Sequence, residues 1–460
     1  MNHQLTELDR RSFLKGSSLA SVMALLGGVP IRAEVAKESQ DDGQTDYKGF
    51  VTPVNCAVIG CGAWGREVLK TLARLPCAPV AAICETYGPY LKRAGDQLAP
   101  NAARYSDYRQ ALEDKNVRAV IVTTPSHQHK EVVLAALAAG KHVYCEAPLA
   151  HTLADARAIA QAAKDAFKLN FQAGLQNRAD PQKYYLVQFV RTGAMGKTIG
   201  GRCQWHRRQS WRLASPNADR EQELNWRLRA ETSPGLLGEL GVHQVDVANW
   251  FIMSPPAAVT GHGSIMHWKD GRTVPDTVQA LFEYPGGELV TYNASLTYSF
   301  DAEHELFYGT HSTIACRDRR AWMFKEVDSP LLGWEVYARR EAFYKESGIV
   351  LDANSTKQTA QSKKVVEDPL ANDETPLHYA LKAFVVNSNL LQAGVEDFAA
   401  AFDANDVAGL KDYLATLAKR RVQAAGWREG LEATVTAIKA NEAILKGQRI
   451  VFDKEWFTLA

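Results

Sequence analysis

A glycine-rich hexapeptide within an alternating pattern of strands and helices most constrains how this chain folds. The hexapeptide GCGAWG (residues 60–65) follows an apolar run at 54–59 that is typical of a buried strand, and it precedes a helical stretch at 66–75. In such a unit the three glycines allow a tight turn, close approach of a diphosphate to the backbone, and close packing of the helix on the strand. The pattern predicts a dinucleotide site at the N-terminus of a helix.

The alternation of strands and helices continues to about residue 173. Apolar runs predict further buried strands at 80–84, 119–122, 142–145 and 170–173, with helical segments between most of them. Short connections between alternating strands and helices indicate a parallel, doubly wound sheet. We therefore expect an NAD-binding Rossmann domain over residues 51–173.

The pattern changes after residue 178 to strand-like runs separated by turns. These runs lie at 199–205, 258–266, 277–284 and 288–297. A Pro-Gly-Gly sequence at 285–287 predicts a hairpin turn between the last two. We expect an α/β fold whose C-terminal substrate-binding α/β domain, residues 174–460, holds a large, mainly antiparallel sheet. A final helix at about 428–445 is expected to pack near the Rossmann domain, and a sheet with one free face favours a homo-oligomer.

The first 33 residues have the pattern of an export signal. The sequence RRSFLK at 10–15 precedes a modestly apolar stretch at 17–31, and twin arginines before a short apolar region are typical of a Tat signal. The apolar stretch is shorter than the roughly 20 residues that a membrane helix needs, so we expect no stable membrane span. Residues 1–33 are predicted to be a Tat signal peptide for periplasmic or extracellular export, and the polar residues 34–50 a linker.

Composition excludes several classes of partner and site. The net charge of +1 gives the chain no electrostatic reason to bind nucleic acid. Seven cysteines occur without any CxxC pair, so neither a cysteine-based zinc site nor a disulfide framework is expected, and we predict no metal. The expected partner is a small molecule.

Glu85 ends the second predicted strand and favours one cofactor over another. A carboxylate there accepts hydrogen bonds from the adenosine ribose hydroxyls and repels a 2′-phosphate, so NAD is preferred and NADP is the less favoured cofactor. A Tat signal adds a second expectation, because that route carries folded proteins. The NAD is expected to be loaded in the cytoplasm and held tightly.

Four further motifs, taken in order, resemble those of the Gfo/Idh/MocA oxidoreductases, the family of glucose–fructose oxidoreductase and inositol dehydrogenase. They are TPSHQH at 124–129, GKHVYCEAP at 140–148, GAMGK at 193–197 and GLLGELGVHQVD at 235–246. The resemblance runs from about residue 54 to the last helix. It implies NAD-dependent hydride transfer on a hydroxyl of a sugar or cyclitol. Glycine motif and resemblance together predict these cofactor-binding residues: Gly60, Gly62, Ala63, Trp64, Gly65, Glu85, Thr124, Pro125, His129, Glu146 and Pro148.

Two positions depart from the family pattern. Ala147 replaces the lysine of the family's Glu-Lys-Pro motif, and Glu239 replaces an aspartate four residues before the histidine. The resemblance implies that these groups handle the substrate's hydroxyl proton. On an α-helix Glu239, His243 and Asp246 would share one face, so that a carboxylate one turn away could orient the histidine as a base. We therefore predict His243 and Glu239 as catalytic residues.

A segment rich in tryptophan and arginine, residues 204–229, is predicted to line the substrate site. Flat aromatic faces stack on sugar rings and arginines donate paired hydrogen bonds, although packing tryptophans with solvated arginines would show the same composition. The predicted substrate-binding residues are Gln176, Arg178, Trp205, Arg207, Trp226, Arg227 and Asp246.

Three hypotheses about function remain side by side. The first is net NAD-dependent oxidation of a sugar or cyclitol hydroxyl. The second takes Ala147 as the sign of a redox-neutral glycosidase or lyase, in which a transient ring oxidation permits elimination before the hydride returns. The third is a non-catalytic sugar-binding protein on the same fold.

Overall fold

The computed structural model describes residues 52–317, 319–338, 340–343, 346–351, 374–403 and 405–459. The predicted signal peptide at 1–33 and the predicted linker at 34–50 lie outside these residues. Within the described part of the chain, no helix is both long and apolar enough to cross a membrane.

The N-terminal half forms a six-stranded sheet in the order β3-β2-β1-β4-β5-β6, and every pair of neighbours is parallel. Its strands are β1 (Cys56–Ile59), β2 (Val80–Cys84), β3 (Ala103–Tyr105), β4 (Ala119–Val122), β5 (His142–Cys145) and β6 (Phe171–Ala173). The intervening helices are α4 (Ala63–Leu72), α5 (Gly88–Gln97), α6 (Tyr108–Glu113), α7 (His129–Ala138) and α8 (Leu153–Asp165), with a 3₁₀ turn η1 (Ser126–Gln128) before α7. The predicted doubly wound parallel sheet is confirmed.

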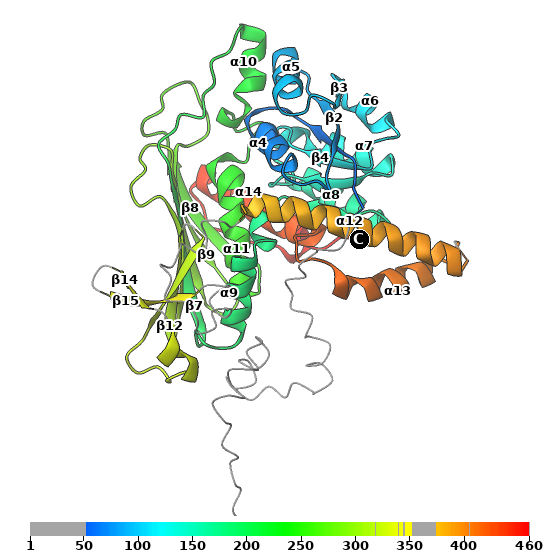
Figure 1. Cartoon of the computed structure of the whole chain (residues 1–460). Coiled ribbons are helices and arrows are strands. Elements are labelled where there is room, and N and C mark those ends of the chain that lie inside the picture. Colours follow the sequence, from blue (N-terminus) through cyan, green and yellow to red (C-terminus); the bar gives the residue numbers. More distant parts are fainter. Residues whose placement is uncertain are drawn as a thin grey trace, which may run out of the picture.

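Both faces of this sheet are covered, because successive residues of a strand point to opposite sides. Cys56 and Val58 pack with α4 and with α12 (Pro376–Ala401), whereas Ala57 and Ile59 pack toward α6, α7 and α8 (Figure 1). Helix α12 therefore belongs to the core of the Rossmann sheet although it lies some 200 residues further along the chain. The predicted Rossmann domain ends at residue 173 and therefore leaves α12 out. The domain limits stay a prediction.

The C-terminal half forms a ten-stranded sheet in the order β14-β15-β13-β12-β11-β7-β10-β9-β8-β16. The strands are β7 (Thr198–His206), β8 (Ala258–Ser264), β9 (Thr277–Glu283), β10 (Leu289–Ser295), β11 (Glu303–Gly309), β12 (Ser312–Arg317), β13 (Arg320–Lys325), β14 (Arg340–Phe343), β15 (Glu346–Leu351) and β16 (Ile450–Val451). Only β7 and β10 pair in parallel among the described strands of this sheet. The predicted hairpin joins β9 to β10, where Gly287 has a φ of +92°.

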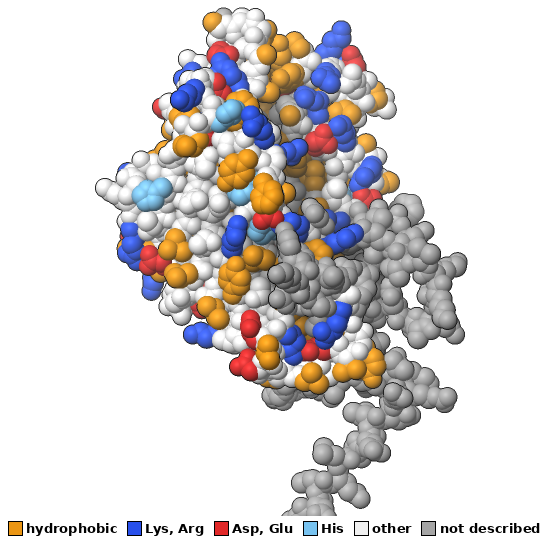
Figure 2. Space-filling model, turned by 90° about the vertical axis from the view of Figure 1, so that its left-hand side faces the viewer, with side chains coloured by type: hydrophobic (Ala, Val, Ile, Leu, Met, Phe, Trp, Pro, Cys, Tyr) orange, Lys and Arg blue, Asp and Glu red, His pale blue; other side chains and the backbone are white. Residues whose placement is uncertain are grey.

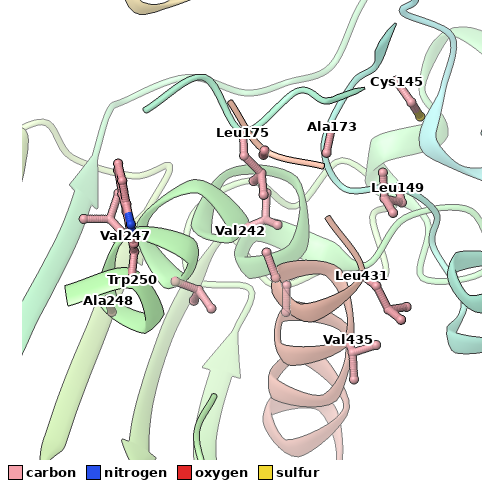
Figure 3. Packing of buried hydrophobic residues seen from close by; sticks show 14 of the residues in the cluster. Cys145, Leu149, Ala173, Leu175, Val242, Val247, Ala248, Trp250, Leu431 and Val435 are labelled. Carbon is pink, nitrogen blue, oxygen red and sulfur yellow. The ribbon is translucent and has the colours of Figure 1, made fainter. Parts of the chain in front are cut away.

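Helices cover one face of the ten-stranded sheet and join it to the Rossmann domain (Figure 1). They are α9 (Pro181–Arg191), α11 (Val242–Ile252) and α14 (Trp427–Lys446); α13 (Val407–Leu417) packs on α12 instead. Figure 3 shows Leu431 and Val435 of α14 near Leu149 and Ala173, which follow or belong to β5 and β6, and near Val242 of α11. Helix α14 thus closes the chain between the two sheets.

The remaining short elements lie where the two halves meet. They are the 3₁₀ turns η2 (Gln176–Arg178) and η3 (Trp226–Leu228), the helix α10 (Ala218–Leu224) and the π-helical turn η4 (Leu237–Gly241). Turn η4 runs directly into α11. The candidate site is built from these elements and from the carboxyl ends of the parallel strands.

Candidate active site

The glycine-rich turn between β1 and α4 has the properties that a diphosphate site needs. Gly60 has a φ of +101°, and a Cβ there would lie 2.8 Å from the backbone of Thr123. A Cβ on Gly65 would overlap the carbonyl oxygen of Gly60. At Gly62, in contrast, a Cβ would meet nothing within 4 Å, and no side chain caps the first turn of α4. Open space in front of unpaired helix amides fits the pyrophosphate of a dinucleotide.

Glu85 lies at the carboxyl end of β2, beside the glycine turn. Its Oε2 accepts a hydrogen bond from the Cys61 amide at 2.8 Å and its Oε1 accepts one from the Tyr87 amide at 2.9 Å. The Thr86 hydroxyl also donates to Oε1, at 3.3 Å, so that of the roughly four acceptor positions of a carboxylate Glu85 keeps one for a ribose hydroxyl. Ala63, the first residue of α4, is exposed at the same edge.

Two buried polar atoms without partners mark the carboxyl ends of β4 and β5. Among the described residues, neither Thr124 Oγ1 nor Glu146 Oε1 has a hydrogen-bond partner. Burial raises the pKa of Glu146 to about 7, although hydrogen bonds from the Trp64 side chain and the Ala147 backbone oppose the shift. The next bond, Ala147–Pro148, is cis. Buried polar groups are normally paired, so these two atoms fit the ribose and amide groups of a bound nicotinamide nucleotide.

His129 does not face the cofactor space, which corrects its predicted role as a cofactor ligand. Its ring is 2% exposed, and its two nitrogens lie 2.9 Å from the carbonyl oxygen of Thr124 and 3.1 Å from that of Pro148. Burial lowers the pKa of His129 to about 4. Both nitrogens face backbone carbonyls, and the neutral ring donates from one of them, so His129 packs between the loop that begins at Pro125 and the loop after β5.

Glu239 does not orient His243, which corrects the predicted catalytic pair. Its Oε1 accepts hydrogen bonds from the hydroxyls of Ser126 at 3.0 Å and Ser233 at 3.1 Å, and Arg227 Nε lies 3.4 Å from its Oε2. Burial raises the pKa of Glu239, while Arg227 and the two serines oppose the shift. The physical reason is tertiary: the carboxylate of Glu239 is bound by Ser126, Ser233 and Arg227, which come from other segments of the chain.

His243 lies on the first turn of α11 and is half-buried. Its ring makes no hydrogen bond to any residue in the described ranges, and burial lowers its pKa to about 4. The imidazole is therefore neutral at pH 7 and able to accept a proton. Of the two predicted catalytic residues, only His243 keeps a side chain free for chemistry.

Arg178 and Asp246, both predicted as substrate ligands, are bound to each other. Arg178 Nη2 lies 2.8 Å from Asp246 Oδ1, and its Nε lies 3.0 Å from Oδ2. The arginine also stacks on Trp250, with its Cζ 4.9 Å from the ring centroid. With the Asp246 residue 1% exposed, this pair joins the turn after β6 to α11, and contact with a substrate stays a prediction. Gln176, on the same turn, is half-buried and stays a candidate.

A long connection between β7 and η4, residues 207–233, forms an arm over the Rossmann domain (Figure 1). Trp205 is half-buried near the end of β7, and Arg207 is exposed where the arm begins. Helix α10 of the arm reaches the loop after β2, where Arg220 Cζ stands 4.4 Å from the ring centroid of Tyr87. The arm therefore contacts the edge of the sheet at which Glu85 lies.

Further along the arm, an aromatic and basic cluster meets the loop after β4. The guanidinium carbon of Arg227 lies 4.9 Å from the Trp226 ring and 5.8 Å from the Trp211 ring. Trp226 in turn lies 5.8 Å from the ring of His127. The structure thus brings the predicted residues Trp226 and Arg227 to the carboxyl edge of the parallel sheet, with Glu239 beneath them.

Several site residues were not predicted from the sequence. Ser126 and His127 stand inside the motif at 124–129, and His151 follows the motif that ends at residue 148, so position relative to these motifs was an available signal. No local pattern distinguishes Ser233 or Arg220, because their partners lie in other segments of the chain.

Comparison with known proteins gives two family models that match consecutive parts of the chain. The first, described as an oxidoreductase family with an NAD-binding Rossmann fold (GFO_IDH_MocA), matches residues 54–174. The second, described as a GFO/IDH/MocA C-terminal domain, matches residues 185–315.

Curated relatives match a shorter part of the chain. A levoglucosan dehydrogenase of Pseudarthrobacter phenanthrenivorans is 29% identical over 207 residues, which cover 43% of this chain and 51% of the relative. A 2,7-anhydro-N-acetylneuraminate hydratase of Escherichia coli is 25% identical over 265 residues, 57% of this chain and 67% of the relative. The chain thus spans about half the length of the first of these relatives.

Solved structures share the fold over most of the chain. An oxidoreductase domain protein from Kribbella flavida superimposes with a TM-score of 0.65 and 19% identity, covering 88% of this chain and 100% of the other. A levoglucosan dehydrogenase in complex with NADH gives a TM-score of 0.64 at 18% identity, covering 87% and 99%.

Proposed function

Since two models of one family match more than half of its residues, the chain belongs to the Gfo/Idh/MocA oxidoreductases, and we propose that it oxidises a hydroxyl of a sugar or cyclitol with NAD. The dehydrogenase among its relatives supports this substrate class. The observation that carries the proposal is the carboxyl edge of the parallel sheet. There an open helix N-terminus, Glu85 and two unpartnered buried atoms fit one dinucleotide.

Each wall of the site has its own task in this proposal. The amides at the start of α4 hold the diphosphate, Glu85 holds the adenosine ribose, and Thr124 and Glu146 hold the nicotinamide end. The bound nicotinamide supplies a hydride acceptor. His243, neutral at pH 7, accepts the hydroxyl proton that leaves the substrate as the carbonyl forms.

A redox-neutral reaction is the second candidate, and Ala147 is the observation that favours it. A methyl group stands where the family motif has a lysine, so that proton carrier is missing. The similarity to a hydratase, whose name describes addition or removal of water, supports the same direction. In this version the hydride returns to the substrate after an elimination, and no net NADH forms.

One purified sample separates the two candidates. The full chain is denatured, and the released nucleotide is identified by mass and absorbance. The native protein is then given levoglucosan or inositol with NAD, and separately an aryl glycoside without added NAD. Stoichiometric NADH supports net oxidation, and aglycone release without added NAD supports the redox-neutral cycle. A protein that neither retains nor binds NAD contradicts both.

A matched pair of histidine variants tests the role of His243. His243→Ala should retain NAD and lose turnover, because the ring makes no hydrogen bond that the described fold needs. His262→Ala removes an exposed histidine on β8 and should leave both properties unchanged. Full turnover in His243→Ala would contradict its role as the base.

We also propose export and self-association, which rest on sequence pattern and sheet shape. The twin arginines at 10–11 support Tat export, and a double Lys variant there should keep the protein in the cytoplasm.

The face of the ten-stranded sheet opposite its helices carries interspersed apolar, basic and acidic side chains (Figure 2). We propose that two copies meet through this face, and native mass measurement tests it.

A further inference from the structure

Two histidines outside the assignments above meet at the carboxyl edge of the parallel sheet. His127 lies in η1 after β4, and His151 lies between β5 and α8. Their rings make an edge-to-face contact, with centroids 6.0 Å apart and planes at 84°. Because β4 and β5 are neighbours, both rings lie at the edge where Thr124 and Glu146 are found.

Each ring has one buried nitrogen with no partner among the described residues, Nδ1 in both cases. Thirteen buried side-chain polar atoms in the described ranges lack a partner, and four of them belong to these two loops. Two of the four, on Thr124 and Glu146, are explained by the cofactor. The two on the histidines are not, and buried polar atoms left unpaired are costly enough that native proteins rarely keep them.

The protonation state of His127 follows from its other contacts. Its ring hydrogen-bonds to the backbone of Thr232, and Nδ1 has no partner, so Nε2 donates and Nδ1 presents a bare lone pair. Burial, and then His151, lower the pKa of His127, while the bond to Thr232 opposes the shift. The ring is therefore neutral at pH 7 and acts as a hydrogen-bond acceptor.

His151 has a different set of charged neighbours. Burial lowers its pKa; Asp155 opposes this shift and Lys130 adds to it, and those two residues form an ion pair at 2.5 Å. On the other side His127 faces His129, which is itself buried and neutral. The charges near His151 thus cancel in pairs, and neither ring has a carboxylate of its own among the described residues.

An aromatic surface and a shortened side chain complete the surroundings. The ring of Trp226 lies 5.8 Å from His127 and covers it from the arm. Ala147, in the same loop as His151, carries only a methyl group. A flat aromatic face and two neutral acceptors thus lie together at this edge of the sheet.

We propose that His127 and His151 form a hydroxyl-binding subsite for a neutral polyol, in which each Nδ1 accepts a hydrogen bond from a substrate hydroxyl and Trp226 covers the ring. The inference rests on the proposed function and narrows its substrate class. Two neutral acceptors bind hydroxyl donors and offer a carboxylate or phosphate group no donor. Arg227, which stacks on Trp226, is paired with Glu239, so we expect the enzyme to prefer uncharged sugars over sugar acids and sugar phosphates.

Matched variants of each histidine test the subsite. His127→Leu and His151→Leu remove the acceptor and keep the bulk, whereas His127→Asn and His151→Asn retain an acceptor oxygen close to the position of Nδ1. With NAD-loaded full-length protein and levoglucosan or inositol, each Leu variant should raise KM about tenfold or more, and each Asn variant should restore most of it. NAD retention should not change in any of the four.

A second measurement does not depend on the variants folding. In the wild-type protein, lowering the pH protonates both rings and turns acceptors into donors. The KM for a neutral polyol should rise and the KM for the corresponding sugar acid should fall. A sugar acid preferred at pH 7, or Leu variants with unchanged KM, would overturn the subsite while leaving NAD-dependent turnover intact. A wild type without bound NAD or turnover instead overturns the proposed function.

Discussion

The cofactor wall and the substrate wall of the candidate site are assembled in different ways. On the cofactor wall, each group lies at the end of a parallel strand and inside a short motif: residues 60–65, Glu85, Thr124 and Glu146. On the substrate wall, the carboxylate of Glu239 accepts hydrogen bonds from Ser126 and from the arm residues Arg227 and Ser233. Short sequence motifs therefore form the cofactor wall, whereas contacts between segments distant in sequence form the substrate wall.

This difference determines which charged groups are free. The cofactor wall leaves polar atoms unpaired for a ligand, as at Thr124 and Glu146. The substrate wall instead uses its charged side chains to hold itself together, as Arg178 with Asp246 and Glu239 with Arg227 show. Charge in a predicted binding segment is therefore a poor guide to the ligand, and unpaired buried atoms are a better one.

Of the variants that test this comparison, Asp246→Asn should lower the stability of the protein most. It leaves Arg178 as a charge largely out of water with no full partner, and removing one member of a buried pair costs about 3–5 kcal/mol. Denaturant unfolding of the full chain measures the loss. Asp96→Asn is the control, since its pair with Arg104 is exposed on both sides and is worth at most about 1 kcal/mol.

The opposite outcome would support the prediction from the sequence that Asp246 binds the substrate. If Asp246→Asn unfolds like wild type and instead raises KM, Asp246 contacts the substrate and the substrate wall is not self-paired.

The order of strands and the position of the glycine turn could be predicted because both follow from local rules. Apolar runs of four or five residues are the buried strands of a parallel sheet, and Gly60 is needed wherever the chain turns with a positive φ. Placement of Glu85 at the end of β2 followed directly from these strands.

The pairing of Glu239 could not be predicted, because it depends on a serine 113 residues away. Helical spacing places Glu239 and His243 near one face of a helix, but it does not say which side chain the carboxylate binds. The docking of α12 on the Rossmann sheet was missed for a similar reason, since an apolar helix surface does not say which sheet it covers.

Gly62→Ala tests the cofactor wall at its most open point. A Cβ there meets no protein atom within 4 Å, so the fold should be unaffected, but the methyl group would occupy the approach to the diphosphate. NAD affinity should fall a hundredfold or more, equal to about 3 kcal/mol, as measured by calorimetry on stripped protein. Gly333→Ala, also in open space but far from the cleft, is the control. Equal NAD affinity in both variants would place the diphosphate elsewhere.

Glu146→Gln should stabilise the unliganded protein above pH 7. Burial raises the pKa of Glu146 from 4.5 to about 7, so the folded protein binds this proton more tightly than the unfolded chain does. Stability is therefore lost as the pH rises through that window, and the amide avoids the loss by on the order of 2 kcal/mol at pH 8. Melting temperatures of NAD-free protein at pH 5 and pH 8 check it, with a larger difference expected at pH 8 than at pH 5. A variant that is less stable at pH 8 would show that the carboxylate is already stabilised without a ligand.

Ser126→Ala and Ser233→Ala give the smallest effect and the sharpest test of the comparison. Both hydroxyls donate to the same oxygen of Glu239, at 3.0 and 3.1 Å, so each deletion should cost about 1 kcal/mol of stability. Only Ser126, however, joins the substrate wall to the loop that carries Thr124. Ser126→Ala should therefore also raise KM or weaken NAD retention, whereas Ser233→Ala should change stability alone. If the two variants behave alike in every assay, Glu239 does not couple the two walls, and the cofactor wall works independently of the contacts that hold its neighbour together.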